Sequence, residues 1–112
     1  MESLFSETIA AISTGMSNSG IGIVRMTGPD SFKIIDKVYH GKKEKTLSSQ
    51  QSHTIHYGHI FDQEEMIDEV LVMLMRGPHT YTGEDTVEVN CHGGVYVVKR
   101  VLETLIHAGA RP

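Results

Sequence analysis

Three β-rich segments follow one another in the second half of this chain, and any compact fold must place all three in a sheet. They cover residues 53–61, 66–75 and 85–91. The short acidic stretch Asp62–Glu65 separates the first two segments, and its length is typical of a hairpin turn. The sequence therefore predicts a hairpin followed by a third strand.

A first helix is predicted before these strands. It is expected to begin at Pro29, with Thr27 or Gly28 as its N-cap, and to end at Gly41. Its apolar side chains recur at helical spacing, at Phe32, Ile34, Ile35, Val38 and Tyr39. This pattern indicates a short amphipathic helix.

A second helix is predicted after them. It follows Gly93–Gly94 and is expected to end at a C′ glycine, Gly109. One face carries five aliphatic side chains, those of Val98, Val101, Leu102, Leu105 and Ile106. This spacing is typical of an amphipathic helix.

The first half of the chain adds two strands, at residues 7–14 and 21–27, separated by a Gly/Ser/Asn loop at 15–20. Residues 41–52 include one apolar side chain in twelve and are expected to form an exposed connector outside the core. The order ββαβββα predicts an α+β fold, with a mixed sheet of about five strands and two helices. A chain of 112 residues fills one core, so we expect a single domain at 1–112.

The charge balance excludes some classes of partner. Ten Lys and Arg against 14 Asp and Glu give a net charge of −4, so no overall basic field attracts nucleic acid or anionic membranes. The longest aliphatic run, residues 70–75, is too short to span a bilayer, and the first residues show no signal peptide. The single cysteine, Cys91, excludes an internal disulfide and fits a reducing compartment. We therefore expect a cytoplasmic protein without a membrane anchor.

Glycine spacing alone does not make a nucleotide site here. Gly15 and Gly20 have the spacing of a phosphate-binding loop, but Ile21-Gly22 follow where lysine and a hydroxyl residue are required. The same stretch lacks the third glycine of a dinucleotide-binding motif. The alternative to a nucleotide site is a flexible loop.

The histidines and the cysteine also show no spacing typical of a metal site or of a catalytic thiol–imidazole pair. His53, His56 and His59 recur every three residues, and strand alternation turns His56 away from the other two, so no metal site is predicted. Cys91 and His92 are adjacent and so face opposite sides of a strand, and Cys91 lies on a valine face as a buried hydrophobe. No catalytic residue is assigned.

Two charged residues interrupt apolar strand patterns. Arg25 alternates with Ile21 and Ile23, on an apolar face where an arginine requires a partner. Glu88 shares a polar face with Asn90, opposite a face of valines, and its carboxylate can accept paired N–H donors from a flat heterocycle or from Arg25 itself. Spacing alone favours a surface charge or an internal salt bridge for each, with ligand binding as the alternative.

Five segments together match one family. They are Thr8–Thr14, Gly20–Gly28, Tyr57–Ile60, Ile67–Val72 and Pro78–Gly94, and the last is the longest and most specific. From about residue 6 to its end, the chain resembles the N-terminal domain of bacterial tRNA modification GTPases of the MnmE (TrmE) family.

The resemblance implies a fold similar to the folate-binding fold of the glycine-cleavage aminomethyltransferase. It also implies a homodimer that binds a tetrahydrofolate derivative, 5-formyl or 5,10-methylene, near the dimer interface. Arg25 and Glu88 match the arginine and glutamate of the family's site, so they are the expected cofactor-binding residues. The family's proline- and arginine-containing loop is replaced at residues 14–19, and a further folate-contacting lysine of the family lies beyond Pro112.

The resemblance further implies a part in the 5-carboxymethylaminomethyl-type modification of the wobble uridine of tRNA, with an FAD-dependent partner subunit (MnmG, also GidA). GTP, Mg²⁺ and K⁺ belong to a GTPase domain that the family carries outside the matched region. The chain alone is therefore expected to be inactive as an enzyme. The alternative is a purely structural homodimerisation module that binds no folate of its own.

Overall fold

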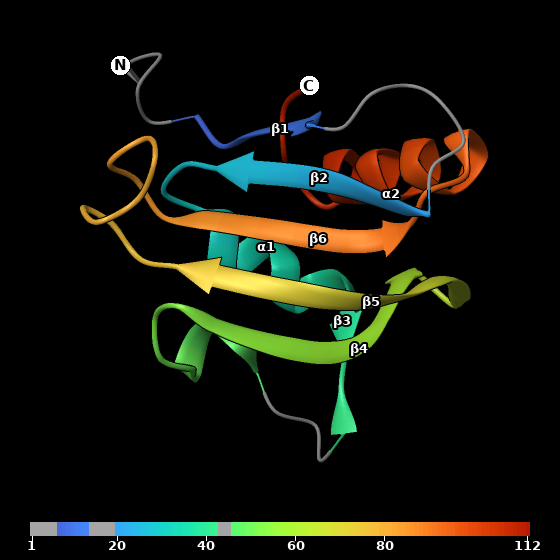
Figure 1. The fold of residues 1–112 in the computed structure, drawn as a ribbon, viewed down its shortest axis with the longest axis horizontal. Coiled ribbons are helices and arrows are strands. Elements are labelled where there is room, and N and C mark those ends of the chain that lie inside the picture. Colours follow the sequence, from blue (N-terminus) through green and yellow to red (C-terminus); the bar gives the residue numbers. More distant parts are fainter. Residues whose placement is uncertain (1–6, 14–19, 43–45) are drawn as a thin grey trace.

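A six-stranded sheet forms the centre of the molecule (Figure 1). The computed structural model describes residues 7–13, 20–42 and 46–112. The strands are β1 (Ile9–Ile12), β2 (Ile21–Thr27), β3 (Tyr39–His40), β4 (Thr54–Asp62), β5 (Glu65–Met75) and β6 (Thr86–His92). The helices are α1 (Ser31–Val38) and α2 (Val95–His107), and a short 3-10 helix, Leu47–Ser49, precedes β4.

The strands lie in the order β1-β2-β6-β5-β4-β3, and each neighbouring pair is antiparallel. The expected α+β class is confirmed, with one strand more than the five or so expected and with antiparallel pairing where a mixed sheet was expected. The predicted hairpin of β4 and β5 is also confirmed, and its register runs from Thr54 opposite Leu74 to Asp62 opposite Glu65. Along each strand, successive side chains therefore point alternately to the two faces of the sheet.

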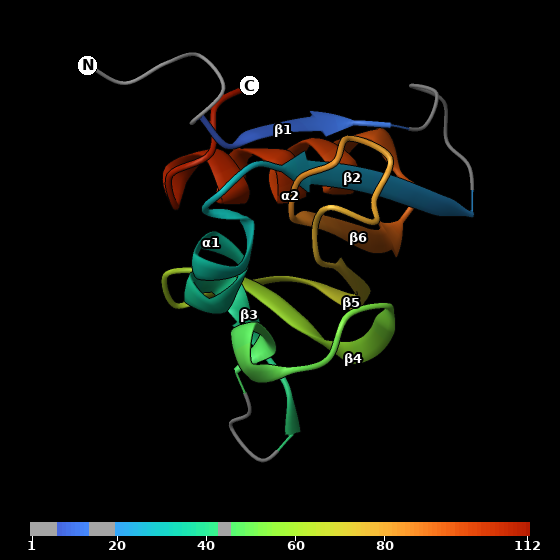
Figure 2. The same ribbon diagram turned by 90° about the vertical axis from the view of Figure 1, so that its left-hand side faces the viewer.

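Both helices cover the same face of the sheet, which lies behind the strands in Figure 1 and is seen from the side in Figure 2. The predicted apolar stripes supply this layer: α1 buries Phe32, Ile34, Ile35 and Val38, and α2 buries Val98, Val101 and Leu105. The strands contribute their alternate residues, among them Val24, Met26, Val72, Val87 and Val89, each at most 2% exposed. Neither helix is long and apolar enough for a membrane span, as far as the described residues go.

The first helix is shorter than predicted at both ends. It begins at Ser31 with Asp30 as N-cap, because Gly28 adopts a positive φ of 137° and its N–H donates to the carbonyl of Asp85. It ends at Val38, because Tyr39 turns to an extended conformation and starts β3. The extra strand, β3, consists of Tyr39 and His40.

The connector 41–52 contributes to the core, contrary to expectation. Its apolar side chain, Leu47, is fully buried. The Asp36 carboxylate at the end of α1 accepts hydrogen bonds from the backbone N–H groups of Leu47 (2.6 Å) and Ser48 (3.3 Å). These bonds fix the turn against α1, so a polar segment still delivers one core residue.

The last residues return to the first strand. Gly109 has a φ of 130°, as expected of a C′ glycine. The chain then runs parallel to β1, where the N–H of Ala10 donates to the Arg111 carbonyl (2.7 Å) and the N–H of Arg111 donates to the Thr8 carbonyl (2.8 Å). An ion pair of 3.0 Å between Arg111 and Glu7 lies beside them.

Candidate functional site

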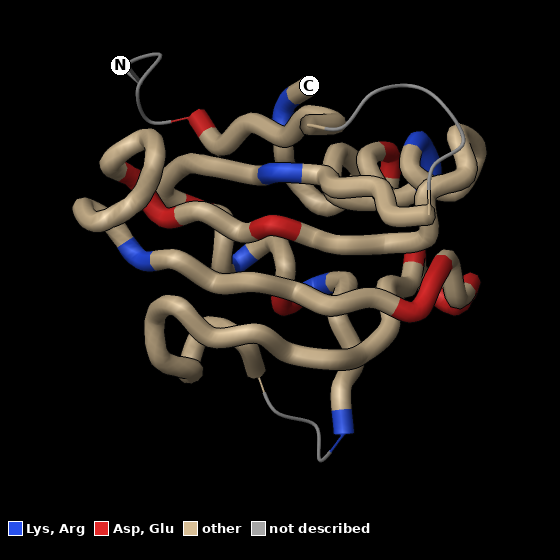
Figure 3. The backbone as a smooth tube through the Cα atoms, viewed as in Figure 1, with Lys and Arg blue, Asp and Glu red and all other residues tan. Residues whose placement is uncertain are grey.

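The face of the sheet opposite the helices, here called the open face, brings Arg25 and Glu88 together. The two residues are direct neighbours across β2 and β6, where a blue and a red segment lie side by side in Figure 3. Arg25 donates from Nε (3.1 Å) and Nη2 (2.9 Å) to the same oxygen, Oε1 of Glu88. The internal salt bridge that the sequence allowed is therefore formed.

Arg25 shares its face with Ile21 and Ile23, as predicted, but this face is turned to solvent. Ile21 is 61% exposed, whereas Val24 and Met26 on the other parity are fully buried. The reason lies at Gly22, on the buried side, where a Cβ would collide with the Val98 side chain of α2. The helix approaches β2 so closely there that a glycine is required on the covered face.

Glu88 lies on the face of β6 that the alternation of the sequence predicted. Val87, Val89 and Cys91 are in the core, and Glu88 and Asn90 face the open side. Glu88 is 8% exposed, yet its second oxygen, Oε2, accepts no hydrogen bond from the described residues. An almost buried carboxylate with a spare acceptor is a strong binding group, because a donor that reaches it replaces little water.

Tyr81 covers the arginine from the loop between β5 and β6. Its ring centroid lies 5.1 Å from the Arg25 guanidinium carbon, and the residue is 79% exposed. The neighbouring Thr82 hydroxyl is hydrogen-bonded to that of Thr27 on β2 at 2.7 Å. Tyr81 was not among the site residues expected from the sequence, although it belongs to the Pro78–Gly94 segment, the longest of those that carry the resemblance.

A cavity of about 340 Å³ opens on the same face, toward the end of β6. It is lined mainly by apolar groups, and its walls include Ile21, Tyr57, Leu71, Asn90 and His92. Ile21, Tyr57 and Leu71 are 61%, 49% and 47% exposed, so a large apolar surface faces solvent here. Exposed apolar surface of this kind is typical of a binding site or an interface.

Two hydrogen-bonded pairs border this cavity. The Tyr57 hydroxyl donates to Glu69 at 2.5 Å, which raises the pKa of the tyrosine. His92 Nδ1 lies 2.7 Å from a carboxylate oxygen of Asp68, and this hydrogen bond raises the pKa of the imidazole. Both pairs hold their side chains in fixed positions at the rim.

Cys91 and His92 point to opposite sides, as predicted. Burial raises the pKa of the Cys91 thiol to about 11, so the thiol stays protonated at neutral pH. Among the described residues, no three His, Cys, Asp or Glu side chains are grouped as a metal site would require. The 14–19 segment, where the sequence departs from the family pattern, is not among the described residues.

Comparison with known proteins agrees with the resemblance. The family model described as "GTP-binding protein TrmE N-terminus" matches residues 8–112. The chain belongs to the TrmE N-terminal domain family. It is 57% identical over 106 residues to the tRNA modification GTPase MnmE of Lachnoclostridium phytofermentans, and 54% and 51% identical over 107 residues to those of Bacillus velezensis and Bacillus subtilis. Each match covers 94% of this chain and 23% of the relative, so the chain spans about a quarter of the length of these proteins.

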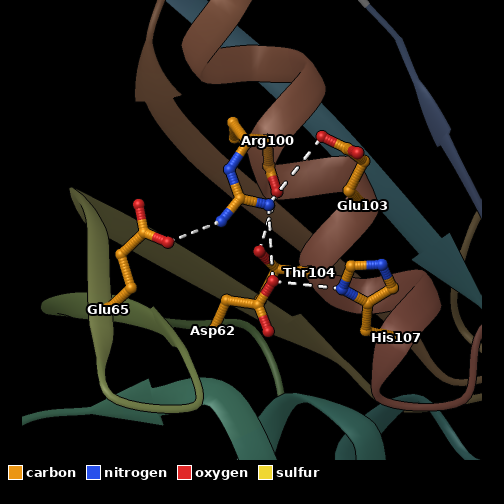
Figure 4. Close-up of polar contacts among 6 residues, drawn as sticks. All are labelled: Asp62, Glu65, Arg100, Glu103, Thr104 and His107. Atoms are coloured by element: carbon orange, nitrogen blue, oxygen red, sulfur yellow. Dashed lines mark hydrogen bonds and ion pairs between the residues drawn. The ribbon is translucent and has the colours of Figure 1, made fainter.

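This TrmE-family domain carries a second arginine-centred cluster on its helix side (Figure 4). Arg100 of α2 contacts Asp62 (3.3 Å) and Glu65 (3.2 Å) at the β4–β5 turn, and Glu103 (3.8 Å) on its own helix. His107 Nδ1 lies 3.0 Å from Asp62, and this hydrogen bond lowers the pKa of the Asp62 carboxyl. The cluster fastens the hairpin turn to α2.

Proposed function

We propose that this TrmE-family domain binds a one-carbon tetrahydrofolate on its open face, as the folate-binding and dimerisation module of a tRNA modification GTPase. The observation that carries the proposal is the Glu88 carboxylate, which is 8% exposed, paired with Arg25 through one oxygen and without a partner for the other among the described residues. The family membership supports it.

The hydrogen-bonding groups of Arg25 and Glu88 suit a pterin. Glu88 Oε2 accepts hydrogen bonds from the amino and ring N–H groups along one edge of a flat heterocycle, a geometry in which a carboxylate is the matching acceptor. Arg25 keeps a third nitrogen, Nη1, for which the described residues provide no hydrogen-bond acceptor, and it donates to a ring oxygen or to a carboxylate. In the 5-formyl or 5,10-methylene form, the tetrahydrofolate supplies the one-carbon unit, while this chain's residues bind and orient it.

A homodimer is the second part of the proposal. The open face exposes large apolar side chains, those of Ile9, Ile21, Ile55, Tyr57 and Leu71. A second copy of the chain that packs here shields this surface and lies next to the Arg25–Glu88 pair. Sedimentation over a concentration series tests it: we expect dimers, and Ile9→Asp shifts the equilibrium toward monomers.

The third part of the proposal concerns the activity of the longer protein. The relatives are named tRNA modification GTPases, and this chain spans 23% of their length. We assign GTP, Mg²⁺ and K⁺ to a different domain, and no catalytic step to this one. The full protein then acts in the cytoplasm on the wobble uridine of tRNA, in 5-carboxymethylaminomethyl-type modification with the FAD-dependent MnmG subunit.

A structural dimerisation module is the competing function, and one observation favours it. The Arg25–Glu88 pair is well formed within the chain itself, so the two charges already satisfy one another. Under that function, Glu88→Gln changes stability and leaves no folate binding to lose.

Calorimetric titration with 5-formyltetrahydrofolate separates the two functions. We expect saturable binding by the chain and a loss of about a hundredfold in affinity in Glu88→Gln, because the neutral amide places an NH2 donor group where one of the two acceptor oxygens is required. Circular dichroism checks that the variant is folded. Absence of binding by a folded, dimeric parent chain contradicts the folate proposal and supports the structural module.

A further inference from the structure

The outer surface of α1 carries two lysines side by side. The helix turns its apolar residues toward the sheet and leaves Lys33 and Lys37 exposed. Side chains four positions apart in a helix are neighbours, with Cβ atoms about 5 to 6 Å from one another. The two ammonium groups therefore lie together on the helix side of the sheet, away from the open face (Figure 2).

No carboxylate neutralises these lysines in the described part of the chain. Arg25, Arg100 and Arg111 each meet a carboxylate oxygen at 3.3 Å or less. Lys33 and Lys37 form no such ion pair with any described residue. Their positive charge is therefore available to an anion from outside the chain.

The acidic residue between the two lysines is already engaged. The two oxygens of Asp36 accept hydrogen bonds from the backbone N–H groups of Leu47 and Ser48. Lys37 donates from Nζ to the carbonyl of Ala108 at the end of α2 (3.1 Å). This bond holds the Lys37 side chain in place and leaves two of its three N–H groups for another acceptor.

The segment that follows has the same sign of charge. Residues 31–53, from α1 to the start of β4, include five of the ten Lys and Arg residues but two of the 14 Asp and Glu residues. An acidic chain therefore has a positive region here. Lys42, exposed just beyond β3, also has no carboxylate partner among the residues that the structure describes. Lys33, Lys37 and Lys42 are here called the lysine surface.

Exposed apolar side chains lie elsewhere in the described structure. The large hydrophobic residues that face solvent belong to β1, β2, β4, β5, the β5–β6 loop and α2. None of them belongs to α1, to β3 or to the 3-10 helix, as far as the described residues go. The core of a protein interface and a membrane-bound helix both require apolar side chains. A nucleic acid backbone, by contrast, is bound by cations alone.

We infer that the lysine surface binds the phosphate backbone of RNA, as a contact surface for the tRNA of the proposed function. The separation of Lys33 and Lys37 is close to that of neighbouring phosphates along one strand. Such contacts position an RNA without reading its sequence. The surface lies on the helix side, so RNA bound there leaves the open face to folate. This inference rests on the tRNA modification part of the proposed function and is independent of folate binding.

The test compares exposed lysines of the two helices. The chain is titrated with a fluorescein-labelled RNA stem-loop of the anticodon-arm type, and fluorescence anisotropy is followed at salt concentrations from about 50 to 200 mM. We expect Lys33→Gln to weaken binding about threefold at low salt and to reduce the slope of log affinity against log salt by about one. The double variant Lys33→Gln/Lys37→Gln is expected to lose about tenfold, with a change in slope of about two.

Lys99→Gln is the matched control. Lys99 is an exposed lysine of α2 that likewise has no carboxylate partner in the described structure, and its loss is expected to change neither affinity nor slope. Lys33→Arg keeps the charge and is expected to bind RNA as the parent does. The affinity for 5-formyltetrahydrofolate is expected to stay unchanged in all these variants, and circular dichroism checks that they are folded.

The outcomes separate this inference from the folate proposal. If Lys33→Gln and Lys99→Gln weaken RNA binding equally, or if the folded parent binds no RNA at low salt, the lysine surface is wrong and the folate proposal stands. If vesicles that contain phosphatidylserine bind the parent more tightly than the stem-loop does, the partner is a membrane and the inference is wrong. If RNA binds as expected and 5-formyltetrahydrofolate does not bind, the folate proposal fails and this inference stands.

Discussion

Arg25 and Arg100 are two different uses of arginine in one small domain. Arg100 meets three carboxylates, on the β4–β5 turn and on its own helix, and its side chain is 17% exposed. Arg25 meets one carboxylate, that of Glu88, and its side chain is 38% exposed. In the part of the chain that the structure describes, one oxygen of Glu88 stays without a partner. The first cluster joins the hairpin turn to α2, whereas in the second an almost buried carboxylate keeps one oxygen that can accept a further hydrogen bond.

The same division applies to the two faces of the sheet. The covered face includes the fully buried side chains and the helix contacts, and the open face includes the exposed apolar groups and the cavity. We therefore expect substitutions on the helix side to change stability without changing folate affinity, and substitutions on the open face to do the reverse. Three measurements test this separation, and a fourth concerns the pH dependence of stability at the rim of the cavity.

The largest effect is expected on the helix side, for Leu47→Ala. Leu47 is fully buried, and its truncation leaves a cavity beneath α1. The free energy of unfolding is expected to fall by about 3 kcal/mol in urea denaturation. Leu71→Ala, at a half-exposed position, is the control and is expected to change stability by less than about 1 kcal/mol. A matching loss of stability in both variants contradicts the division of the two faces.

The next effect is expected at the open site, for Arg25→Lys. Lysine keeps the charge but not the planar set of donors that reaches both Glu88 and a ligand. We expect the affinity for 5-formyltetrahydrofolate to fall roughly thirtyfold, with a change in stability below about 1 kcal/mol. Calorimetry and urea denaturation measure the two. An unchanged affinity with a clear loss of stability would assign this pair to the same structural class as Arg100.

Arg100→Ala is expected to have a smaller effect, on stability alone. It removes the ion pairs and the packing of the side-chain stem, and it lowers the free energy of unfolding by about 1 kcal/mol. Lys99→Ala, one residue away and exposed, is the matched control and is expected to be neutral. A loss of folate affinity in Arg100→Ala would show that the two sides are coupled.

The smallest effect concerns His92 at the rim of the cavity. Its hydrogen bond to Asp68 raises its pKa above the ordinary value of 6.5, so the protonated imidazole stabilises the fold below that pH. This contribution is lost as the pH rises through the raised pKa. Asp68→Asn is expected to return the pKa to about 6.5 in an NMR titration. Thermal denaturation then shows a larger difference between parent and variant at about pH 5.5 than at about pH 8, and the opposite order contradicts the assignment.

The parts of the fold that followed from the sequence have a strong local pattern. The β4–β5 hairpin and α2 each combine a long apolar repeat with a turn or a terminal glycine. Strand β3 could not be anticipated, because its two residues read as the last turn of the helix before it. Leu47 was missed for a different reason, since the hydrogen bond from its N–H to Asp36, which holds it against α1, joins positions 11 residues apart across a polar segment.

The site was predictable in its residues and not in its orientation. The alternation around Glu88 is clear, because its valine neighbours define the buried side. Around Arg25, apolar residues occupy both faces of the strand, so composition does not show which face is covered. Gly22 decides it, and the reason is the closeness of Val98 on a distant helix. Tyr81 reaches Arg25 through a loop whose path no local pattern specifies.

The return of Arg111 to β1 has a mechanical consequence. The chain direction at Arg111 is the same as that of β1, and two backbone hydrogen bonds and the Glu7 ion pair join the two segments. A force that pulls residues 7 and 112 apart slides these two segments along one another. The two bonds are then loaded together, in shear, and must break at the same moment. Tension between these two residues is therefore taken up first at β1, before it reaches the β2–β6 pair that holds Arg25 and Glu88.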